Sequence, residues 1–428
     1  MPVGAQDLQG IREMFRILCN IRPFDAVICC ALMLPSLASA LTFNDALRIA
    51  DQQAPSLQAE TAKLQAARSD AIPAGELPDP KLLLGVQSVP IEGSERWSLD
   101  RDGMTMSMVG VMQDMPNRDK RRARVEVARA GIERAAAERD IEALNVRQAT
   151  AQAWIISHAI ERKLATFDAL YAENRLLAEI VQARIAGGRG QVAESVQPRQ
   201  QAALLAERAD ELQQQRRQAR ATLERWVGDA AREPLDGGLP HWQLDAQALQ
   251  HQLRNHPQLQ AYAPMTQQAQ ARIREATAER KPDWSWEVDY LRRGREFGDM
   301  VNLQVSFDLP IFQRSRQSPR IAARHAELNQ LEAEREALER QFAEQLGSEL
   351  AELERLQRAL TRTREVFLPL ARERAELSLA DYRAGSGELG TVLAARSELI
   401  ETQLKQIDLE GLQAIAASRL YFAYGDAR

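Results

Sequence analysis

The chain has 428 residues, with 55 basic and 60 acidic side chains and a formal net charge of −5. Both charges are interspersed along the sequence, so the charge pattern gives no argument for nucleic-acid binding. Ala, Leu, Glu, Gln and Arg dominate while aromatic residues make up only 5%, a composition typical of long helices. We find no nucleophile–base set and no phosphate-binding loop, so the sequence does not indicate an enzyme or a cofactor.

The first 40 residues resemble an export signal. Three arginines precede an apolar run at 26–37, which is followed by the A-x-A-type cleavage pattern Ala38-Ser39-Ala40. The cysteines of the chain all lie in this segment, at Cys19, Cys29 and Cys30. The residues before Cys29 and Cys30 are not the small ones that a lipoprotein signal prefers. We therefore predict a cleaved signal peptide over 1–40 without lipid attachment, and a mature chain without disulfides or thiolate metal sites.

The next 190 residues or so predict two strands between helices. The expected elements are a helix at 41–74 broken at Pro55 and capped by Thr42 or Asn44, strands at 81–89 and 104–113, a helix at 117–186, a glycine turn at 186–190 and a helix at 192–226. At 1.5 Å per residue, the helix at 117–186 is about 100 Å long. Its start carries a basic run, Lys120 to Arg124, which could bind phosphate. We favour the interpretation that the run marks the start of a helix near a membrane boundary.

The same order of elements recurs about 200 residues later. Ala54-Pro55-Ser56-Leu57 is echoed by His256-Pro257-Gln258-Leu259, and Gln113-Asp114-Met115-Pro116 by Phe307-Asp308-Leu309-Pro310. We predict a first repeat over 41–228, a linker at 229–244 and a second repeat over 245–428. The second repeat should contain strands at 284–291 and 300–308 and a long helix at 318–383 that is kinked at Pro369.

The strands at 284–291 and 300–308 alternate apolar and polar residues and form a predicted hairpin. Strands of nine or ten residues can cross a bilayer when tilted. We expect apolar side chains such as Val288, Leu303 and Val305 to face lipid. Glu287, Asp289 and Gln304 should then line a wet lumen. A hairpin of a soluble sandwich is the alternative, which the mid-strand carboxylates and the second copy of the unit disfavour.

Metal binding is not predicted from the sequence. Met104, Met106, Met108 and Met112 share one alternation face and could form a soft-metal ladder, but we favour a lipid-facing role for them. Glu287 and Asp289 could bind cations, although lining a lumen is the simpler role. The five histidines show no ligand spacing.

Four membrane strands cannot close a barrel, because the smallest known barrels have eight, and open edges in lipid leave peptide groups unpaired. The chain must therefore oligomerise, and a closed ring is the usual solution. A periplasmic coiled-coil scaffold would not need the strands, and a porin would not need helices of about 100 Å.

The whole chain after residue 40 resembles the TolC-type outer-membrane efflux factors. The resemblance rests on QDMP and FDLP at the strand-to-helix joins, and on the tip segment Tyr382 to Gly387 followed by Val392, Leu393 and Arg396. Leu77-Pro78-Asp79-Pro80 and the basic helix entry are most similar to the heavy-metal branch. The resemblance implies a mainly α fold, with a homotrimeric 12-stranded β-barrel continued by an α-helical tunnel.

The resemblance also implies a function and partners. The chain would be the outer-membrane duct of a tripartite system, with a periplasmic adaptor and an inner-membrane resistance–nodulation–division pump. Heavy-metal cations are the favoured solute; drugs, other organic solutes or secreted proteins are the alternatives. No cofactor, bound metal or nucleic acid is implied.

In this family a tyrosine and charged partners close the tip, and Tyr382 matches that tyrosine. The arginine of the family motif is replaced by Gly387, and Ser195, Thr391 and Ala394 stand where aspartates are often found. Glu194 and Glu388 are the nearby substitutes. The predicted gate and adaptor-docking tip therefore consists of Gly187, Gly188, Glu194, Tyr382, Gly385, Gly387 and Glu388. We expect its four glycines to permit the reversals through positive φ.

Overall fold

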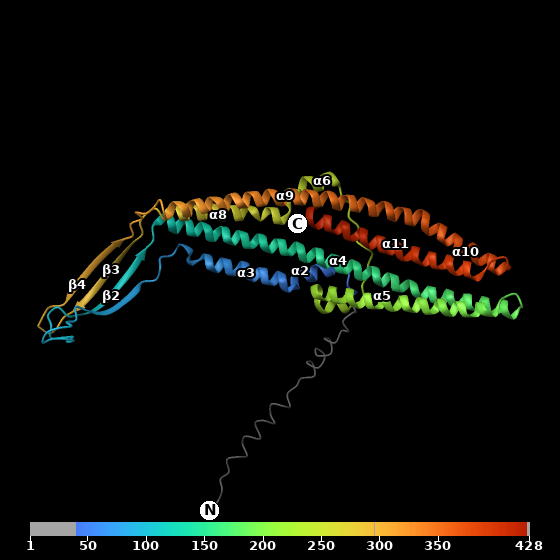
Figure 1. Ribbon diagram of the computed structural model, residues 1–428, viewed down its shortest axis with the longest axis horizontal. Helices are drawn as coiled ribbons and strands as arrows, with labels where there is room; N and C mark the ends of the chain where they lie inside the picture. The colour runs from blue at the N-terminus through green and yellow to red at the C-terminus, as the bar shows by residue number, and fades with distance from the viewer. Residues whose placement is uncertain (1–39, 295, 426–428) are drawn as a thin grey trace, which may run out of the picture.

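The computed structural model describes residues 40–294 and 296–425. Residues 1–39 of the predicted signal peptide, with its three cysteines, lie outside these residues. The molecule is elongated, with its strands at one end and two helix reversals at the other (Figure 1). Within the described residues, no helix combines the length and apolar character needed to cross a membrane.

The first half contains two short helices, two strands and a pair of long helices. They are α2 (Phe43–Gln53), α3 (Pro55–Ala71), β1 (Lys81–Gln87), β2 (Met106–Met115), α4 (Arg118–Ala186) and α5 (Gln197–Val227). The predicted cap is Thr42, whose hydroxyl accepts the Asp45 N–H. Asn117 caps α4 by accepting the Lys120 N–H at 2.9 Å. The 69 residues of α4 make a helix about 100 Å long, as predicted.

The second half follows the same order. Its elements are α6 (Ala246–Gln252), α7 (Pro257–Gln260), α8 (Tyr262–Ala278), β3 (Trp284–Arg292), β4 (Met300–Phe307), α9 (Gln317–Arg362), α10 (Leu368–Ala384) and α11 (Leu389–Tyr424). A π-helical turn at Thr363–Phe367 joins α9 to α10. It ends two residues before Pro369, which lacks an N–H and crowds the carbonyl four residues back. The wider turn accommodates this proline, so the disturbance lies where the sequence predicted it.

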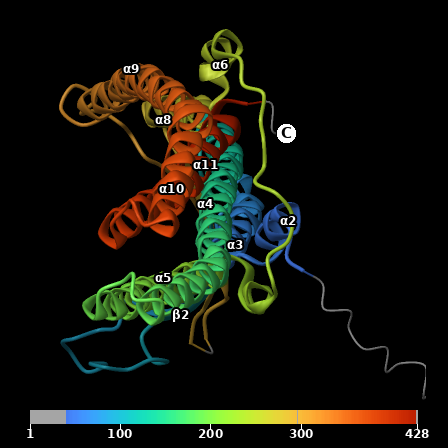
Figure 2. The ribbon, with the colours of Figure 1, turned by 90° about the vertical axis from the view of Figure 1, so that its right-hand side faces the viewer.

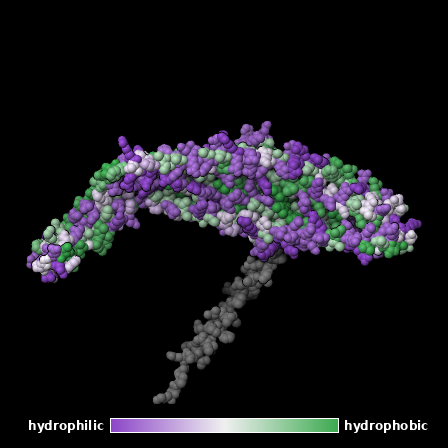
Figure 3. Space-filling view, viewed as in Figure 1, coloured by the Kyte–Doolittle hydropathy of each residue, from purple (hydrophilic) through white to green (hydrophobic). Residues whose placement is uncertain are grey.

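The four strands form one antiparallel sheet in the order β1-β2-β3-β4. Directly paired residues share a face. Val288 pairs with Val111 and Leu303, whereas Glu287 pairs with Met112 and Gln304. The predicted division of the second hairpin into an apolar and a polar face is therefore confirmed. The apolar face is exposed, and apolar side chains are visible over the sheet end of the molecule (Figure 3).

The methionines of β2 do not lie on that apolar face. The expectation that they face lipid together with Val288 and Leu303 was therefore wrong. Met112 lies opposite Glu287, and Met108 lies opposite Leu291 on the same face as Asp289. Met106 follows the same alternation, and Met104 precedes the strand. The outward face of β2 is instead formed by residues such as Val109 and Val111. The methionines therefore share a surface with the carboxylates.

The main core lies midway along the molecule and is organised around α4. Viewed along the long axis, α4 lies between α11 and the α2–α3 pair (Figure 2). Trp154 of α4 is fully buried, donates its indole N–H to the Leu41 carbonyl at 3.1 Å, and packs edge-on against Phe43. Ala414 and Ile415 of α11 belong to the same cluster. The core thus joins the beginning and the end of the described chain.

Candidate functional site

The two helix reversals meet at the end of the molecule far from the sheet (Figure 1). Gly188 and Gly385 adopt φ of +67° and +88°, the left-handed region in which glycine is favoured. Gly187 and Gly387 do not, so the expectation of positive φ was wrong for these two. A Cβ on Gly387 would lie 3.0 Å from the Tyr382 backbone nitrogen. Glycine at 387 therefore permits close approach of two backbone segments.

Tyr382 of α10 links the two halves of the chain at this tip. Its side chain is fully buried, and its hydroxyl donates to Glu194 Oε2 at 2.9 Å. The Arg184 guanidinium lies 3.9 Å from the centre of the Tyr382 ring and donates to the Tyr382 carbonyl. Glu194 and Arg184 belong to the first reversal, whereas Tyr382 belongs to the second. The arrangement therefore ties one helix pair to the other.

The Tyr382–Glu194 hydrogen bond persists across the neutral pH range. Burial, followed by the hydrogen bond to Glu194, raises the pKa of Tyr382 to about 12. The phenol therefore stays protonated and donates to a carboxylate, a charge-assisted bond stronger than a neutral one.

An apolar cluster supports this tie. Leu177 and Val181 of α4 and Leu389 and Val392 of α11 pack around Tyr382 and are nearly or completely buried. Glu388, by contrast, is exposed at the start of α11. The structure thus joins Tyr382 with Glu194 and leaves Glu388 at the surface.

Sequence reasoning missed Arg184. It is one of many arginines along the long helices, and its role arises because the reversal after α4 brings it against Tyr382. Spacing along α4 gives no signal of that contact.

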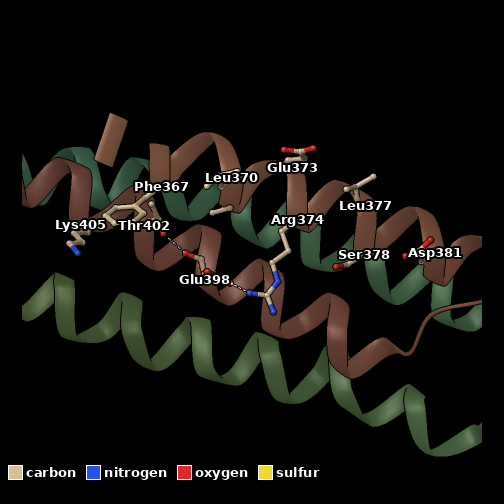
Figure 4. A pocket seen from close by; sticks show the side chains of 11 residues that line it. Phe367, Leu370, Glu373, Arg374, Leu377, Ser378, Asp381, Glu398, Thr402 and Lys405 are labelled. Atoms are coloured by element: carbon tan, nitrogen blue, oxygen red, sulfur yellow. Dashed lines mark hydrogen bonds and ion pairs between the residues drawn. The ribbon is translucent and has the colours of Figure 1, made fainter. Parts of the chain in front are cut away.

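A surface groove of about 650 Å³ lies between α10 and α11, beside the π-helical turn (Figure 4). Phe367, Leu370 and Leu377 line it and are each about half exposed. Arg374 and Glu398 form an ion pair of 2.6 Å across it. The described chain does not fill this groove, so its apolar walls are open to solvent in a single protomer.

Glu410 clamps the helices near the middle of the molecule. Its carboxylate is 8% exposed and accepts from Arg162 of α4 at 2.5 Å and from Arg364 of the π-helical turn at 2.7 Å. Burial alone would raise the pKa of Glu410, but hydrogen bonds from Arg364, Gln406 and Arg162 outweigh it and lower that pKa. The ionised Glu410 therefore holds α11 against both elements.

The join between strands and helices uses the basic run at the start of α4. Asp283 accepts from the Asn117 N–H at 2.8 Å and pairs with Lys120 at 2.7 Å. Arg124 pairs with Glu275 of α8 at 3.1 Å. Lys120 and Arg124 thus fix the two halves together where the sheet begins, and α4 starts here as predicted.

Glu287, Asp289 and Gln304 lie on one face of the sheet. Asp289 is only 2% exposed. Its Oδ2 accepts from the Asn302 amide at 3.2 Å, whereas its buried Oδ1 has no hydrogen-bond partner among residues 40–294 and 296–425. Histidine, cysteine, aspartate and glutamate form no metal-binding group of three or more in the described part of the chain.

Comparison with known proteins gives a consistent result. Residues 248–426 match the family model of the outer membrane efflux proteins, and no curated protein sequence matches the chain. Among solved structures, the chain is similar to the outer membrane protein VceC from Vibrio cholerae, with 19% identity and a TM-score of 0.74 over 90% of this chain and 96% of that one.

Two further solved structures have the same fold. A membrane protein from Pseudomonas aeruginosa is 16% identical with a TM-score of 0.77, covering 90% of each chain. CusC, described in terms of transmembrane channel formation, is 17% identical with a TM-score of 0.73, over 90% of this chain and 92% of that one.

Proposed function

We propose that this chain, whose residues 248–426 belong to the outer membrane efflux protein family and whose fold is that of the TolC-type channels, is the exit duct of a tripartite efflux system. The family is one of passive transport ducts, so no catalytic step is involved. The duct would span the outer membrane through its strands and reach into the periplasm through its helices.

The observation that carries this proposal is the sheet. Its outward face bears exposed apolar side chains such as Leu84, Leu303 and Val305. In the described chain β1 pairs only with β2 and β4 only with β3, so both sheet edges are open. Open edges are not tolerated in lipid. Three protomers that join β1 to β4 would form a closed 12-stranded barrel.

Exposed apolar side chains on the helices support the same homotrimer. The groove beside Phe367 and Leu370 is unfilled, and Leu204 of α5 is 59% exposed. Isolated apolar side chains at a surface are ordinary, but a contiguous groove usually marks an interface. In the trimer, the helix pairs of adjacent protomers would cover these surfaces and complete the tunnel wall.

The gate would lie at the tip, where Tyr382 and Glu194 tie the helix pairs together. A periplasmic adaptor would dock on the exposed turns around Gly187, Gly385 and Glu388. It can open the duct only by binding the open state better than the closed one. The energy for export would come from an inner-membrane pump of the resistance–nodulation–division type.

Heavy-metal cations are the solutes that we favour. The polar face of the sheet carries Glu287 and Asp289, which attract cations to the lumen. Drugs, other organic solutes or proteins remain the alternative cargoes. Export assays in cells with the gene deleted would separate them, because loss of the duct should sensitise cells to its own class of solute.

The direct test is reconstitution of the purified protein in planar lipid bilayers. We expect discrete conductance steps. The protein should also fractionate with the outer membrane and migrate on a gel as a trimer whose mobility changes on heating. A periplasmic coiled-coil scaffold would instead be monomeric or dimeric, would fractionate with soluble proteins and would produce no conductance. That result would refute the proposal.

A further inference from the structure

We propose that the inner face of the sheet binds one soft monovalent cation per protomer, copper(I) or silver(I), through the Met108 and Met112 thioethers and the Asp289 carboxylate. The placement of this site in the lumen rests on the proposed duct function. The residues themselves are brought together by the strand register.

The register puts the three side chains within reach of one another. Asp289 of β3 lies directly opposite Gly110 of β2, and Met108 and Met112 flank Gly110 on the same face. Such diagonal neighbours lie about 7–8 Å apart, a distance that long side chains span. Gly110 has no side chain, and the Asp289 carboxylate occupies that space: its Oδ1 would be 2.0 Å from a Cβ on Gly110. The carboxylate thus lies over β2 between the strand positions of the two methionines, while the Met108 side chain lies over Gly85 of β1.

Asp289 has an unused coordinating atom. Its side chain is 2% exposed, and Oδ1 has no hydrogen-bond partner anywhere in the described chain. A buried carboxylate oxygen without a partner is costly, so a cation is favoured beside it. Lys81, the basic residue on this face of β1, does not supply that charge because it pairs with Asp114 at 2.7 Å. The second carboxylate, Glu287, lies on the same face opposite Met112.

The donor set selects the kind of ion. Thioethers are soft ligands that favour copper(I), whereas Mg²⁺ and Ca²⁺ require several oxygen ligands. Asp289, the carboxylate at the proposed site, balances a single positive charge. The Met108 sulfur accepts a hydrogen bond from Gln87 Nε2 at 3.1 Å, but thioethers are weak acceptors and Met has three rotatable bonds. Met108 can therefore turn toward Asp289 at little cost.

A site with only three ligands should bind loosely, which suits a duct. Conduction requires binding strong enough to admit the ion and weak enough to release it. A weak site of this kind in each protomer would let soft cations pass through the barrel without trapping them.

The test is silver(I) titration of the purified mature protein, from which cleavage of the signal peptide has removed Cys19, Cys29 and Cys30, in chloride-free buffer, followed by calorimetry. We expect one silver ion per protomer and at least tenfold weaker binding in the double variant Met108→Leu/Met112→Leu. Leu and Met have similar volumes, so the strand should be preserved. Asp289→Asn should also weaken binding. Met115→Leu is the matched control, because Met115 is on β2 but pairs with Trp284 on the opposite face.

X-ray absorption at the silver edge should show sulfur ligands in the wild type and not in the double variant. Unchanged silver affinity in the double variant, or wild-type binding through oxygen ligands alone, would overturn the site. Bilayer conductance of the same preparations separates the two proposals. A conducting wild type without silver binding refutes only the cation site, whereas absence of conductance refutes the duct.

Discussion

Tyr382 makes the contact on which closure of the tip should depend. Tyr382→Phe removes the hydroxyl that donates to Glu194 but keeps the ring beneath Arg184. A hydrogen bond to a charged group contributes about 1.5–3 kcal/mol, so its loss should raise the open population of the gate by tenfold or more. We expect higher open probability in single-channel recordings and greater sensitivity of cells to vancomycin.

The control for this variant is Tyr171→Phe, which alters a tyrosine of α4 beside a separate core cluster around Phe167. It should leave both readouts unchanged. If Tyr382→Phe also behaves as the wild type, the gate lies elsewhere, with the exposed Glu388 as the next residue to test.

His256 should make the folded state sensitive to acid. Burial lowers its pKa from 6.5 to about 4, because its ring lies against Phe342 and is 6% exposed. The unfolded chain therefore binds a proton at higher pH than the folded one, and stability is lost as pH falls from 6.5 toward 4. The free energy of unfolding should fall by at most about 3 kcal/mol through this group.

The measurement is thermal unfolding by circular dichroism as a function of pH. His256→Asn keeps a cap acceptor for the Gln258 N–H but cannot titrate, so its stability should fall less between pH 6.5 and 4. His251 is exposed, so His251→Asn should show the same dependence of stability on pH as the wild type. If the stability of the wild type and of His256→Asn fell equally with pH, the assignment of the acid sensitivity to His256 would be contradicted.

At the scale of the element, the two faces of β4 should respond differently to the same substitution. Leu303 lies on the outward apolar face and is 70% exposed in a single protomer. Leu303→Arg would place a charge in lipid and should cost roughly 2–4 kcal/mol. Gln304→Arg puts the same side chain in the lumen and should have little effect. Urea unfolding and the yield of trimer provide the measurement; equal losses from both variants would show that the faces are misassigned.

Most elements were predictable because their patterns are local. Alternation in β3 and β4 separates apolar from polar residues, and Pro55, Pro369 and the glycine turns mark interruptions of the helices. The outward face of β2 was not predictable in this way. Both of its faces carry apolar residues, since the methionines alternate with Val109 and Val111. Only pairing with β3 decides which set lies beside the carboxylates.

The candidate site was predictable only in part for a related reason. Tyr382 and Glu194 stand out beside the glycine turns in the sequence, but their mutual contact requires two reversals to meet. Gly387 has a role that its identity does not reveal, because close backbone approach and positive φ both select glycine. Arg184 gives no local signal at all.

For the whole molecule, the joining of protomers can be tested through the two open sheet edges. Within one sheet β1 and β4 are three strand spacings apart, about 14 Å, whereas a disulfide needs Cα atoms within about 7 Å. Cysteines placed at Leu82 or Leu84 in β1 and at Val301 or Leu303 in β4 can therefore bond only between protomers. We expect at least one pair to produce a covalent trimer on a non-reducing gel.

The internal control is Leu84→Cys with Val109→Cys, a directly paired position in the same sheet. It should form a disulfide within one chain and migrate as a monomer. Efficient bonding in this control without covalent trimers from any edge pair would contradict the shared barrel.

The core around Trp154 has a consequence for the timing of folding. Leu41 and Phe43 belong to the same cluster as Ala414 and Ile415. A chain synthesised from its N-terminus cannot complete this core until α11 has left the ribosome. Contacts between such distant segments also form slowly, because the intervening chain must first lose its conformational freedom. The unfinished chain therefore lacks its main core while it is made, and translocation across a membrane requires a chain that has not completed its fold.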